Sequence, residues 1–293
     1  MDWFGLFAGL SAAAIWGGMY VASKAVLDVV PPFTLLTLRL LLGIFSLLPF
    51  VWRAGGIRFT RQQWKQVLGV GVVGYGVSLG FQFVGTKLST AANGALVTSA
   101  TPAFVLLWAA WILGERITRR RLLALGLATL GVIIVLDPRS AHLSTGLFWG
   151  NLSLVMAALT WALYSVLIRK VTRGLDVLPV SVVTFLGGLP LTIPAAGLEM
   201  NTLGLGTLSW GAVLSILYVG VISTALAMYL WNTAFARLEA GVASLTFFAQ
   251  PVVGAGLGAL LLNEHLTPLF LFGGLLIGLG LVLAAQGKPS NSN

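Results

Sequence analysis

Residues 101–116 read TPAFVLLWAAWILGER, and residues 250–265 read QPVVGAGLGALLLNEH. Each stretch starts an apolar run with a proline and has a glutamate 13 positions after it, and the two stretches are 149 residues apart. The same separation pairs other residues: Gly71 with Gly220, and Gly131 with Gly280. A shared register of proline, glutamate and glycine indicates that the chain consists of two similar halves.

The composition excludes a water-soluble enzyme. The 293 residues are 58% hydrophobic and only 9% charged, with a mean hydropathy of +0.97, whereas soluble domains carry about 25% charged residues. The chain has no cysteine, which excludes disulfides, zinc–thiolate sites and thiol catalysis. A net charge of +9 is typical of basic cytoplasmic loops in a membrane protein, and we expect no nucleic-acid partner.

Apolar segments long enough to cross a bilayer recur along the whole chain. They are residues 3–23, 32–52, 65–86, 91–113, 120–136, 146–168, 178–198, 209–232, 241–262 and 268–285. Five crossings in each half is an odd number, so the second half must be inverted relative to the first. The sequence therefore predicts an all-α polytopic membrane protein with ten transmembrane helices, arranged as two inverted five-helix repeats over residues 1–143 and 144–293.

The distribution of basic residues predicts the orientation. Thirteen of the 17 Lys and Arg residues fall on the side that holds both termini and the even-numbered connections. Cytoplasmic loops carry such an excess, so both termini are expected in the cytoplasm.

Three other functional classes fit the sequence less well than a carrier. An intramembrane enzyme needs acid–base pairs or metal ligands within the membrane, and all eight acidic residues lie at predicted helix ends or in loops. A channel more often forms an oligomeric pore. Residues 69–74 match the dinucleotide pattern G-x-G-x-x-G, but they lie in a predicted membrane helix without the preceding strand that the motif requires. A secondary carrier remains, and its driving force is expected to be facilitated efflux or exchange.

Two prolines, Pro102 and Pro251, are predicted to kink or open their apolar helices because proline removes a backbone hydrogen bond. Polar and aromatic residues near them are candidates for the substrate cavity: Asn93, Thr98, Thr101, Ser244, Phe247 and Gln250. Freed carbonyls in a membrane are tolerated where they face protein or a water-filled cavity. The alternative is that these residues only shape helix contacts.

Aromatic residues at helical spacing occur at matching places in the two halves: Trp16 with Tyr20, and Trp161 with Tyr164. Further candidates come from the third and eighth predicted helices: Tyr75, Gln82, Met228 and Trp231. Aromatic faces stack on flat substrates and attract ammonium groups. Two interpretations stay open for each aromatic residue, namely cavity lining and ordinary core contacts.

Three charged residues are candidates for gates or ion pairs. Arg39 is the only charge well inside a predicted helix, where charge is costly and usually partnered or functional; the alternative is that it snorkels to the interface. Glu115 and Glu264 lie at helix ends, either as alternating gates or as solvated charges.

Several of these motifs resemble those of the EamA family within the drug/metabolite transporter superfamily. The residues that carry the resemblance are 14–17 (AIWG), 114–116 (GER), Gly126 and Gly131, with second-half counterparts 160–162 (TWA), 263–265 (NEH), Gly274 and Gly280. Asn263 stands where a glycine is expected. Within the family the chain is most similar to exporters of aromatic amino acids.

The resemblance implies a secondary transporter in a bacterial inner membrane that exports aromatic or other hydrophobic amino acids by alternating access. Export of nucleosides, drugs or other metabolites is the alternative. The resemblance implies a small-molecule substrate and contact with the lipid bilayer, no cofactor, no metal, no catalytic residue, and function as a monomer.

Overall fold

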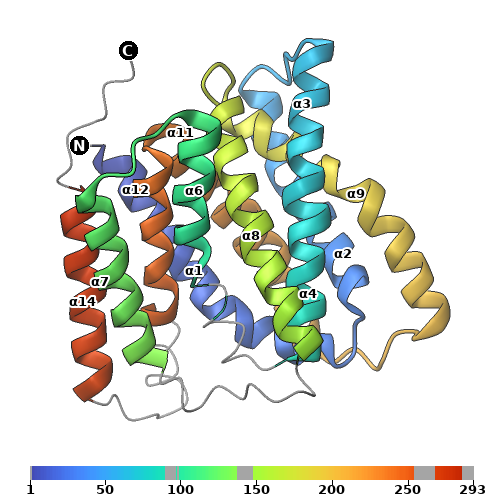
Figure 1. Cartoon of the computed structure of the whole chain (residues 1–293). Helices are drawn as coiled ribbons and strands as arrows, with labels where there is room; N and C mark the ends of the chain where they lie inside the picture. Colours follow the sequence, from blue (N-terminus) through green and yellow to red (C-terminus); the bar gives the residue numbers. More distant parts are fainter. Residues whose placement is uncertain (1, 90–96, 98, 137–147, 254–267, 286–293) are drawn as a thin grey trace.

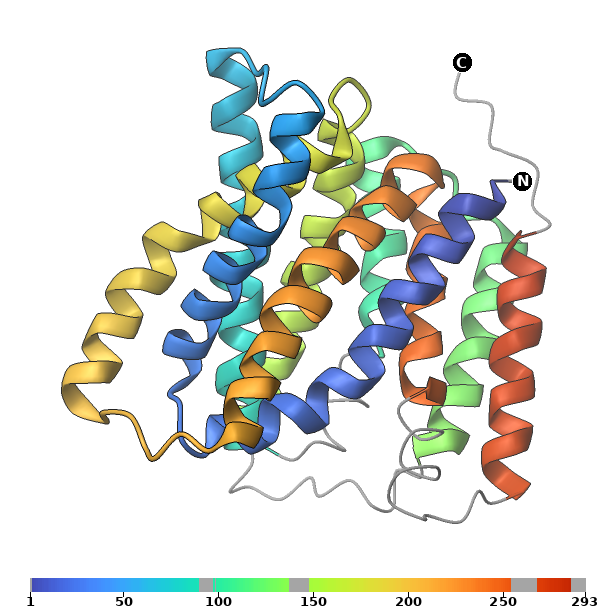
Figure 2. The same cartoon turned by 180° about the vertical axis from the view of Figure 1, so that it is seen from behind.

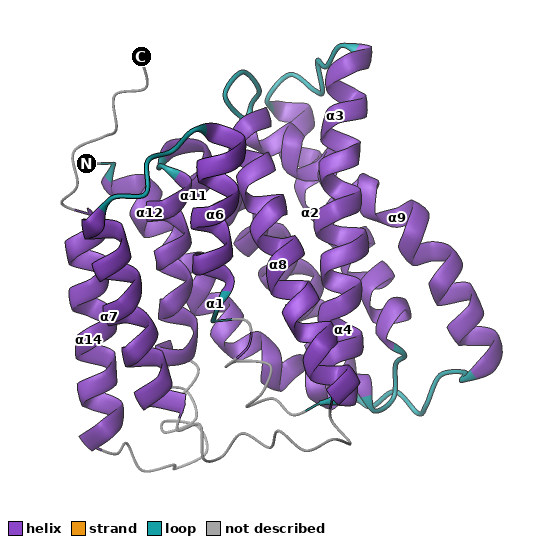
Figure 3. Ribbon diagram, in the orientation of Figure 1, coloured by secondary structure: helices purple, strands orange, loops and turns teal. Residues whose placement is uncertain are grey.

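Helices account for all regular secondary structure in the described part of the chain (Figure 3). The structure is a computed structural model that describes residues 2–89, 97, 99–136, 148–253 and 268–285. The first half contains α1 (Trp3–Leu27), α2 (Pro32–Arg53), α3 (Arg61–Gly71), η1 (Val72–Ser78), α4 (Leu79–Leu88), α6 (Thr101–Leu113) and α7 (Arg119–Leu136). The second half contains α8 (Phe148–Val171), α9 (Val177–Thr202), α10 (Trp210–Leu217), η4 (Tyr218–Leu226), α11 (Ala227–Arg237), α12 (Ala240–Leu245), η5 (Thr246–Phe248) and α14 (Pro268–Ala285).

Local sequence signals account for several helix ends. The Asp2 carboxylate accepts a hydrogen bond from the Gly5 N–H at 2.9 Å and caps α1. Thr60 and Gln63 form a reciprocal capping box at the start of α3. Gly114 ends α6 in the left-handed conformation, with φ of 68°, which glycine adopts without a steric penalty.

Five helices of the described residues are long and apolar enough to cross a membrane. They are Pro32–Arg53, Arg61–Leu88, Phe148–Val171, Val177–Thr202 and Trp210–Arg237. Four apolar helices are shorter: Trp3–Met19, Thr101–Leu113, Ala240–Val253 and Phe272–Leu283. Parts of the predicted spans 91–113 and 241–262 lie outside the described residues, so the count of ten crossings stays a prediction.

The molecule has a largely apolar outer surface, and its apolar core also holds buried polar side chains. Large apolar side chains face outward, such as Trp111 at 77% exposed, whereas Arg39 and Asn232 are both 0% exposed. Lipid solvates apolar surface, and polar groups inside a membrane protein find partners among its own helices. This distribution supports a membrane environment independently of hydropathy.

Helix contacts between the two halves occur in exchanged pairs. α1 packs against α11 while α8 packs against α4, and η1 packs against α9 while η4 packs against α2. α7 and α14 lie side by side at one edge (Figures 1 and 2). Their close approach needs glycine, because a Cβ on Gly131 would lie 2.5 Å from the Gly273 carbonyl oxygen and a Cβ on Gly280 would lie 2.8 Å from that of Ala124.

The two halves also run in opposite directions. α1 starts at the end of the molecule where α8 finishes (Figure 1). The connections α2–α3, α6–α7, α8–α9 and α11–α12 all lie at this same end (Figure 1). We call it the basic end, because it holds Arg58, Arg116, Arg119, Arg173 and Arg237.

A π-helical segment interrupts the same long helix in each half. Residues Val72–Ser78 form η1 between α3 and α4, and Tyr218–Leu226 form η4 between α10 and α11. π-Helical turns shift the backbone hydrogen-bond register and occur frequently at functional sites. Neither segment was expected from the sequence, although both are rich in small residues.

Candidate functional site

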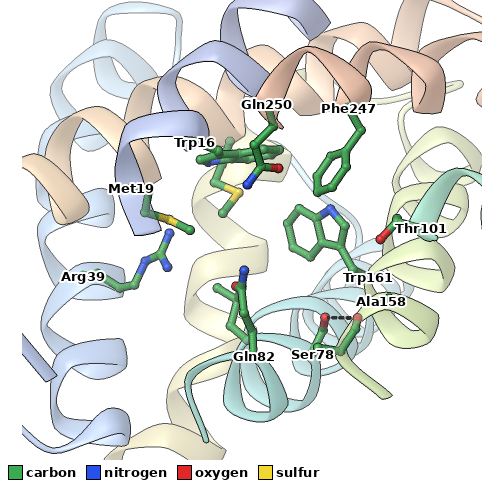
Figure 4. Close-up of a pocket in the computed structure, with 13 residues that line it drawn as sticks. Trp16, Met19, Arg39, Ser78, Gln82, Thr101, Ala158, Trp161, Phe247 and Gln250 are labelled. Atoms are coloured by element: carbon green, nitrogen blue, oxygen red, sulfur yellow. Dashed lines mark hydrogen bonds between the residues drawn. The ribbon is translucent and has the colours of Figure 1, made fainter. Parts of the chain in front are cut away.

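A small cavity lies between the two halves, where α1, α2, α4, α6, α8, α11 and the helix after η5 meet (Figure 4). Its volume is about 30 Å³, which is space for a few water molecules at most. Its wall consists of Trp16, Met19, Arg39, Ser78, Leu79, Gln82, Thr101, Ala157, Ala158, Trp161, Met228, Phe247 and Gln250. The wall side chains of the two halves therefore leave only a narrow space between them.

The sequence-predicted residues divide into three groups. Those that line the cavity are Trp16, Gln82, Thr101, Trp161, Met228, Phe247, Gln250 and also Arg39. Those buried elsewhere are Tyr75, Tyr164, Trp231 and Ser244. The third group lies outside the described residues: Asn93, Thr98, Glu264 and the side chain of Tyr20.

Aromatic rings from both halves border the cavity on one side. Trp16 and Trp161 form an edge-to-face pair with ring centroids 5.8 Å apart and an interplanar angle of 79°. The ring centroids of Phe247 and Trp16 lie 6.1 Å apart. The Trp16 indole N–H donates to the Ser223 carbonyl at 3.0 Å, so its polar tip is satisfied and its orientation is set. The residues that the repeat pairs in sequence therefore meet in space.

Tyr75, Tyr164 and Trp231, which were predicted to line the cavity, are all 0% exposed and lie behind its wall in this structure. The hydroxyl groups of Tyr75 and Tyr164 are 2.6 Å apart. Tyr164 also donates to the Asn232 Oδ1 at 2.9 Å, and the Trp231 indole N–H donates to the Ser165 Oγ at 3.1 Å. These hydrogen bonds fix the orientation of the residues behind the wall. Trp161 stacks on one of them, Tyr164, with ring centroids 4.7 Å apart.

Ser244 does not present its hydroxyl to the cavity either. It is fully buried, and its Oγ donates to the Gly241 carbonyl at 3.1 Å. Hydroxyl side chains in membrane helices commonly bond back to their own helix. In this structure Ser244 therefore follows the alternative interpretation, in which it shapes the helix.

The two prolines differ in their structural roles. Pro102 lies in the first turn of α6, which begins at Thr101, where the missing N–H breaks no helical bond. Pro251 follows the 3₁₀ turn η5, within the helix Ala240–Val253. The helix thus tightens directly before Pro251 and brings Phe247 and Gln250 to the cavity wall.

Arg39 is fully buried and does not snorkel to the interface. Its Nε donates to the Thr224 Oγ1 at 2.8 Å, and its Cζ lies 5.4 Å from the centre of the Phe83 ring. The Nη1 and Nη2 atoms have no hydrogen-bond partner in the described structure. Two unpaired cationic donors therefore belong to a residue of the cavity wall.

Glu115 lies in an ion-pair network at the basic end and is only 9% exposed, so its interpretation as a solvated charge is wrong. Its Oε1 accepts from the Arg169 Nε at 3.0 Å and from the Ala240 N–H at 2.8 Å. Arg121 contacts Glu115 at 3.5 Å and also pairs with Glu239. The network joins the connection after α6 to α7, α8 and the start of α12.

Sequence reasoning missed five residues of the wall: Met19, Ser78, Leu79, Ala157 and Ala158. Helical spacing contained a signal for four of them, because residues three or four apart share a face. Met19 follows Trp16 by three positions, Ser78 precedes Gln82 by four, and the two alanines precede Trp161 by four and three. Small side chains were overlooked, although they make room beside the indole rings.

Known proteins resemble this chain along nearly its whole length. The model of the EamA-like transporter family matches residues 3–137 and 148–286. A protein of Salmonella typhimurium named "Probable amino-acid metabolite efflux pump" is 28% identical over 292 residues, which are 96% of this chain and 94% of that protein. A protein of Escherichia coli with the same name is 26% identical and covers 95% and 93%. A solved structure titled "Crystal structure of protein" has a TM-score of 0.79 at 21% identity and covers 96% of both chains, which shows a shared fold.

Proposed function

Because the chain belongs to the EamA-like transporter family, we propose that this membrane transporter exports aromatic or other hydrophobic amino acids by alternating access. The observation that carries the proposal is the cavity between the two halves, where Gln250 lies beside Trp16 and Arg39 lies across the space from Trp161 (Figure 4). Aromatic faces suit an apolar side chain, and the polar groups suit the backbone of an amino acid. The bacterial relatives named amino-acid metabolite efflux pumps support this substrate class.

Alternating access requires that each end opens in turn. In the structure Glu115 links helices at the basic end. Its carboxylate accepts hydrogen bonds from Arg169 of α8 and from the backbone N–H at the start of α12. Helices of both halves meet at this network, so its rupture frees them to separate. We assign the network the role of a gate at the basic end, which is closed while these ion pairs are formed.

The proposed topology has ten crossings with repeats over residues 1–143 and 144–293, and both termini in the cytoplasm. It is supported by the basic connections that gather at one end of the molecule (Figure 1). Cytoplasmic loops of membrane proteins carry such an excess of Lys and Arg. The transporter would then function as a monomer in the bacterial inner membrane, with the basic end toward the cytoplasm.

The cavity wall in the described residues contains no carboxylate. Proton-coupled carriers commonly relay protons through acidic or histidine side chains in the membrane. We therefore propose facilitated efflux or exchange, driven by the substrate gradient.

Counterflow in proteoliposomes tests the proposal. Purified full-length protein is reconstituted with an excess of one unlabelled compound inside, and uptake of the labelled compound is followed. We expect uptake of L-phenylalanine, L-tryptophan or L-leucine above that of protein-free liposomes. Uptake of nucleosides alone, with no amino acid in the panel exchanged, would replace the proposed substrate class by the alternative one.

A further inference from the structure

The guanidinium of Arg39 is an unused binding group in the cavity wall. It is 0% exposed, and its Nη1 and Nη2 atoms are without partners. The ion pairs formed by the described residues lie at the basic end and do not include Arg39. A buried cation without a counter-charge is costly, and within a membrane it is usually functional.

Neighbouring groups hold the guanidinium in one orientation. The Arg39 Nε is occupied by the Thr224 Oγ1 at 2.8 Å, and the Thr224 hydroxyl donates in turn to the Val219 carbonyl at 2.7 Å within the π-helical segment η4. The Phe83 ring lies at 5.4 Å from the Cζ atom. With one edge used, the edge formed by Nη1 and Nη2 is left for a ligand, and Figure 4 shows the group pointing into the space between Met19 and Gln82.

This free edge has the geometry that a carboxylate needs. Two parallel N–H donors on a planar cation bind the two oxygens of a carboxylate in a fork-to-fork pair. Gln250 belongs to the same wall and is only 6% exposed. Its Oε1 atom has no hydrogen-bond partner in the described structure. It is an acceptor for a substrate N–H, and the Trp16 and Trp161 rings border the remaining space.

We propose that Arg39 binds the carboxylate of the exported substrate through Nη1 and Nη2, a role that rests on the proposed amino acid export. The substrate class then consists of free amino acids with an unmodified α-carboxylate. Amines, amino acid amides and nucleosides lack the group that neutralises Arg39. Selectivity follows from the cost of leaving the buried cation unpaired.

The first test needs no variant. Counterflow of labelled L-phenylalanine by the full-length protein is competed with L-phenylalanine, L-phenylalaninamide or phenethylamine. These probes share the aromatic side chain and differ in the carboxylate. We expect the amide and the amine to compete at least about tenfold more weakly, because each charge-assisted hydrogen bond contributes about a factor of ten or more.

The second test changes the arginine. Arg39→Met keeps an unbranched stem and removes the charged group, and Arg39→Lys keeps the charge and removes the fork. Arg58→Met is the same substitution at an exposed position. We expect Arg39→Met to lose about tenfold or more of L-phenylalanine affinity and also the preference over the amide, Arg39→Lys to be intermediate, and Arg58→Met to match the wild type. Gel filtration and thermal unfolding in detergent measure how much of each variant is folded. The transport rate is then expressed per folded molecule.

The outcomes separate the two proposals. Exchange of L-phenylalanine with equal competition by the amide overturns the role of Arg39 and leaves amino acid export standing. Unchanged affinity and preference in folded Arg39→Met does the same. Failure of the wild type to exchange any amino acid overturns both. If Arg39→Met does not fold, the probe competition on the wild type decides the question alone.

Discussion

Trp161 and Trp231 offer a direct comparison between a residue of the cavity wall and one behind it. Both are indoles from the second half, with ring centroids 6.4 Å apart. Trp161 borders the cavity and is 7% exposed, whereas Trp231 is 0% exposed and hydrogen-bonded to Ser165. We expect Trp161→Ala to impair transport more than folding, and Trp231→Ala to impair folding more than transport.

The magnitudes follow from the contacts. Removal of a buried Trp typically costs about 3–5 kcal/mol of folding free energy. Trp231 should lie at the upper end, because it also contacts Trp16, Phe235 and Phe247 at 5.2, 4.8 and 5.6 Å. Trp161 should lie at the lower end, because the side of its ring that borders the cavity has no contacts to lose.

Transport should show the opposite order. Loss of an aromatic stacking surface weakens ligand binding by about 1–3 kcal/mol, judged from base–aromatic stacking, which is about five- to 150-fold in affinity. We expect this loss of L-phenylalanine affinity in Trp161→Ala, and affinity within about threefold of the wild type in Trp231→Ala. Thermal unfolding in detergent and counterflow per folded molecule measure the two effects. Native transport by folded Trp161→Ala would assign this residue to the core and refute the reasoning.

Four further changes probe topology, coupling, the gate and a helix cap. In this cysteine-free chain, Asp28→Cys should react with an impermeant thiol reagent from outside the cell. Arg58→Cys should react only after permeabilisation, because in the proposed topology the basic end faces the cytoplasm. Counterflow should persist in liposomes with equal pH and no membrane potential, because the described cavity wall holds no carboxylate. Glu115→Gln should raise the labelling of Ser78→Cys from the basic end about tenfold or more, because breaking a buried ion pair costs about 3–5 kcal/mol in the closed state. Asp2→Ala should cost about 0.5–2 kcal/mol. The Gly5 N–H lowers the pKa of the Asp2 carboxyl below 3.8, so this stabilisation is present above that pH and is lost as pH falls through the lowered pKa. Thermal unfolding measured over a series of decreasing pH values tests this.

Each of these expectations has an opposing result. Labelling of Arg58→Cys from outside reverses the orientation, and complete loss of counterflow without gradients removes the facilitative mechanism. Glu199→Gln is the control for the gate, because this carboxylate accepts from the Phe33 N–H at 2.8 Å away from the basic end. Equal labelling in both glutamine variants removes the gate. An Asp2→Ala deficit that stays constant down to pH values where the carboxyl is fully protonated removes the carboxylate as its source.

The repeat pattern predicted more of the site than composition did. Trp16 and Trp161 were paired because they occupy matching places in the two halves. In the structure their ring centroids lie 5.8 Å apart. Paired residues of inverted repeats approach one another near the interface between the halves, so position in the repeat contains three-dimensional information. Positions without such pairing, including Ser78 and Ala158, were missed.

Hydrophobic patterning could not decide which aromatic residues face the cavity. In a soluble protein, polarity separates the outer face of a helix from the inner one, but lipid and protein interior are both apolar. Tyr164 follows Trp161 by three residues and shares its helix face broadly, yet it is fully buried in a hydrogen-bonded layer with Tyr75. Only the contacts between helices distinguish the aromatic residues that line the cavity from those buried behind it.

The π-helical segments lay beyond sequence reasoning for a different reason. A π-helical turn forms when a backbone N–H bonds to the carbonyl five residues before it, and not to the carbonyl four residues before it. Glycine-rich runs such as residues 69–76 permit both hydrogen-bond patterns, so the sequence does not determine which one forms. The consequence is functional: Thr224 within η4 holds Arg39 at 2.8 Å, and Ser78 at the end of η1 donates to the Ala157 carbonyl at 2.9 Å. Both segments thus place a hydroxyl beside the cavity.

The halves are alike in scaffold and unlike in charge, and this difference follows from what such a site must bind. The aromatic pair Trp16 and Trp161 comes once from each half, but the first half has Arg39 in its second helix where the second half has Leu186. A pseudo-two-fold axis would otherwise place a second cation opposite the first, and two unpaired cations in one small cavity would repel each other strongly in a low dielectric. An amino acid has one carboxylate and one ammonium group, so it needs a cation on one side only and an acceptor such as Gln250 elsewhere in the wall. An uncharged residue at Leu186 therefore fits the proposed substrate, which could not neutralise a second buried cation.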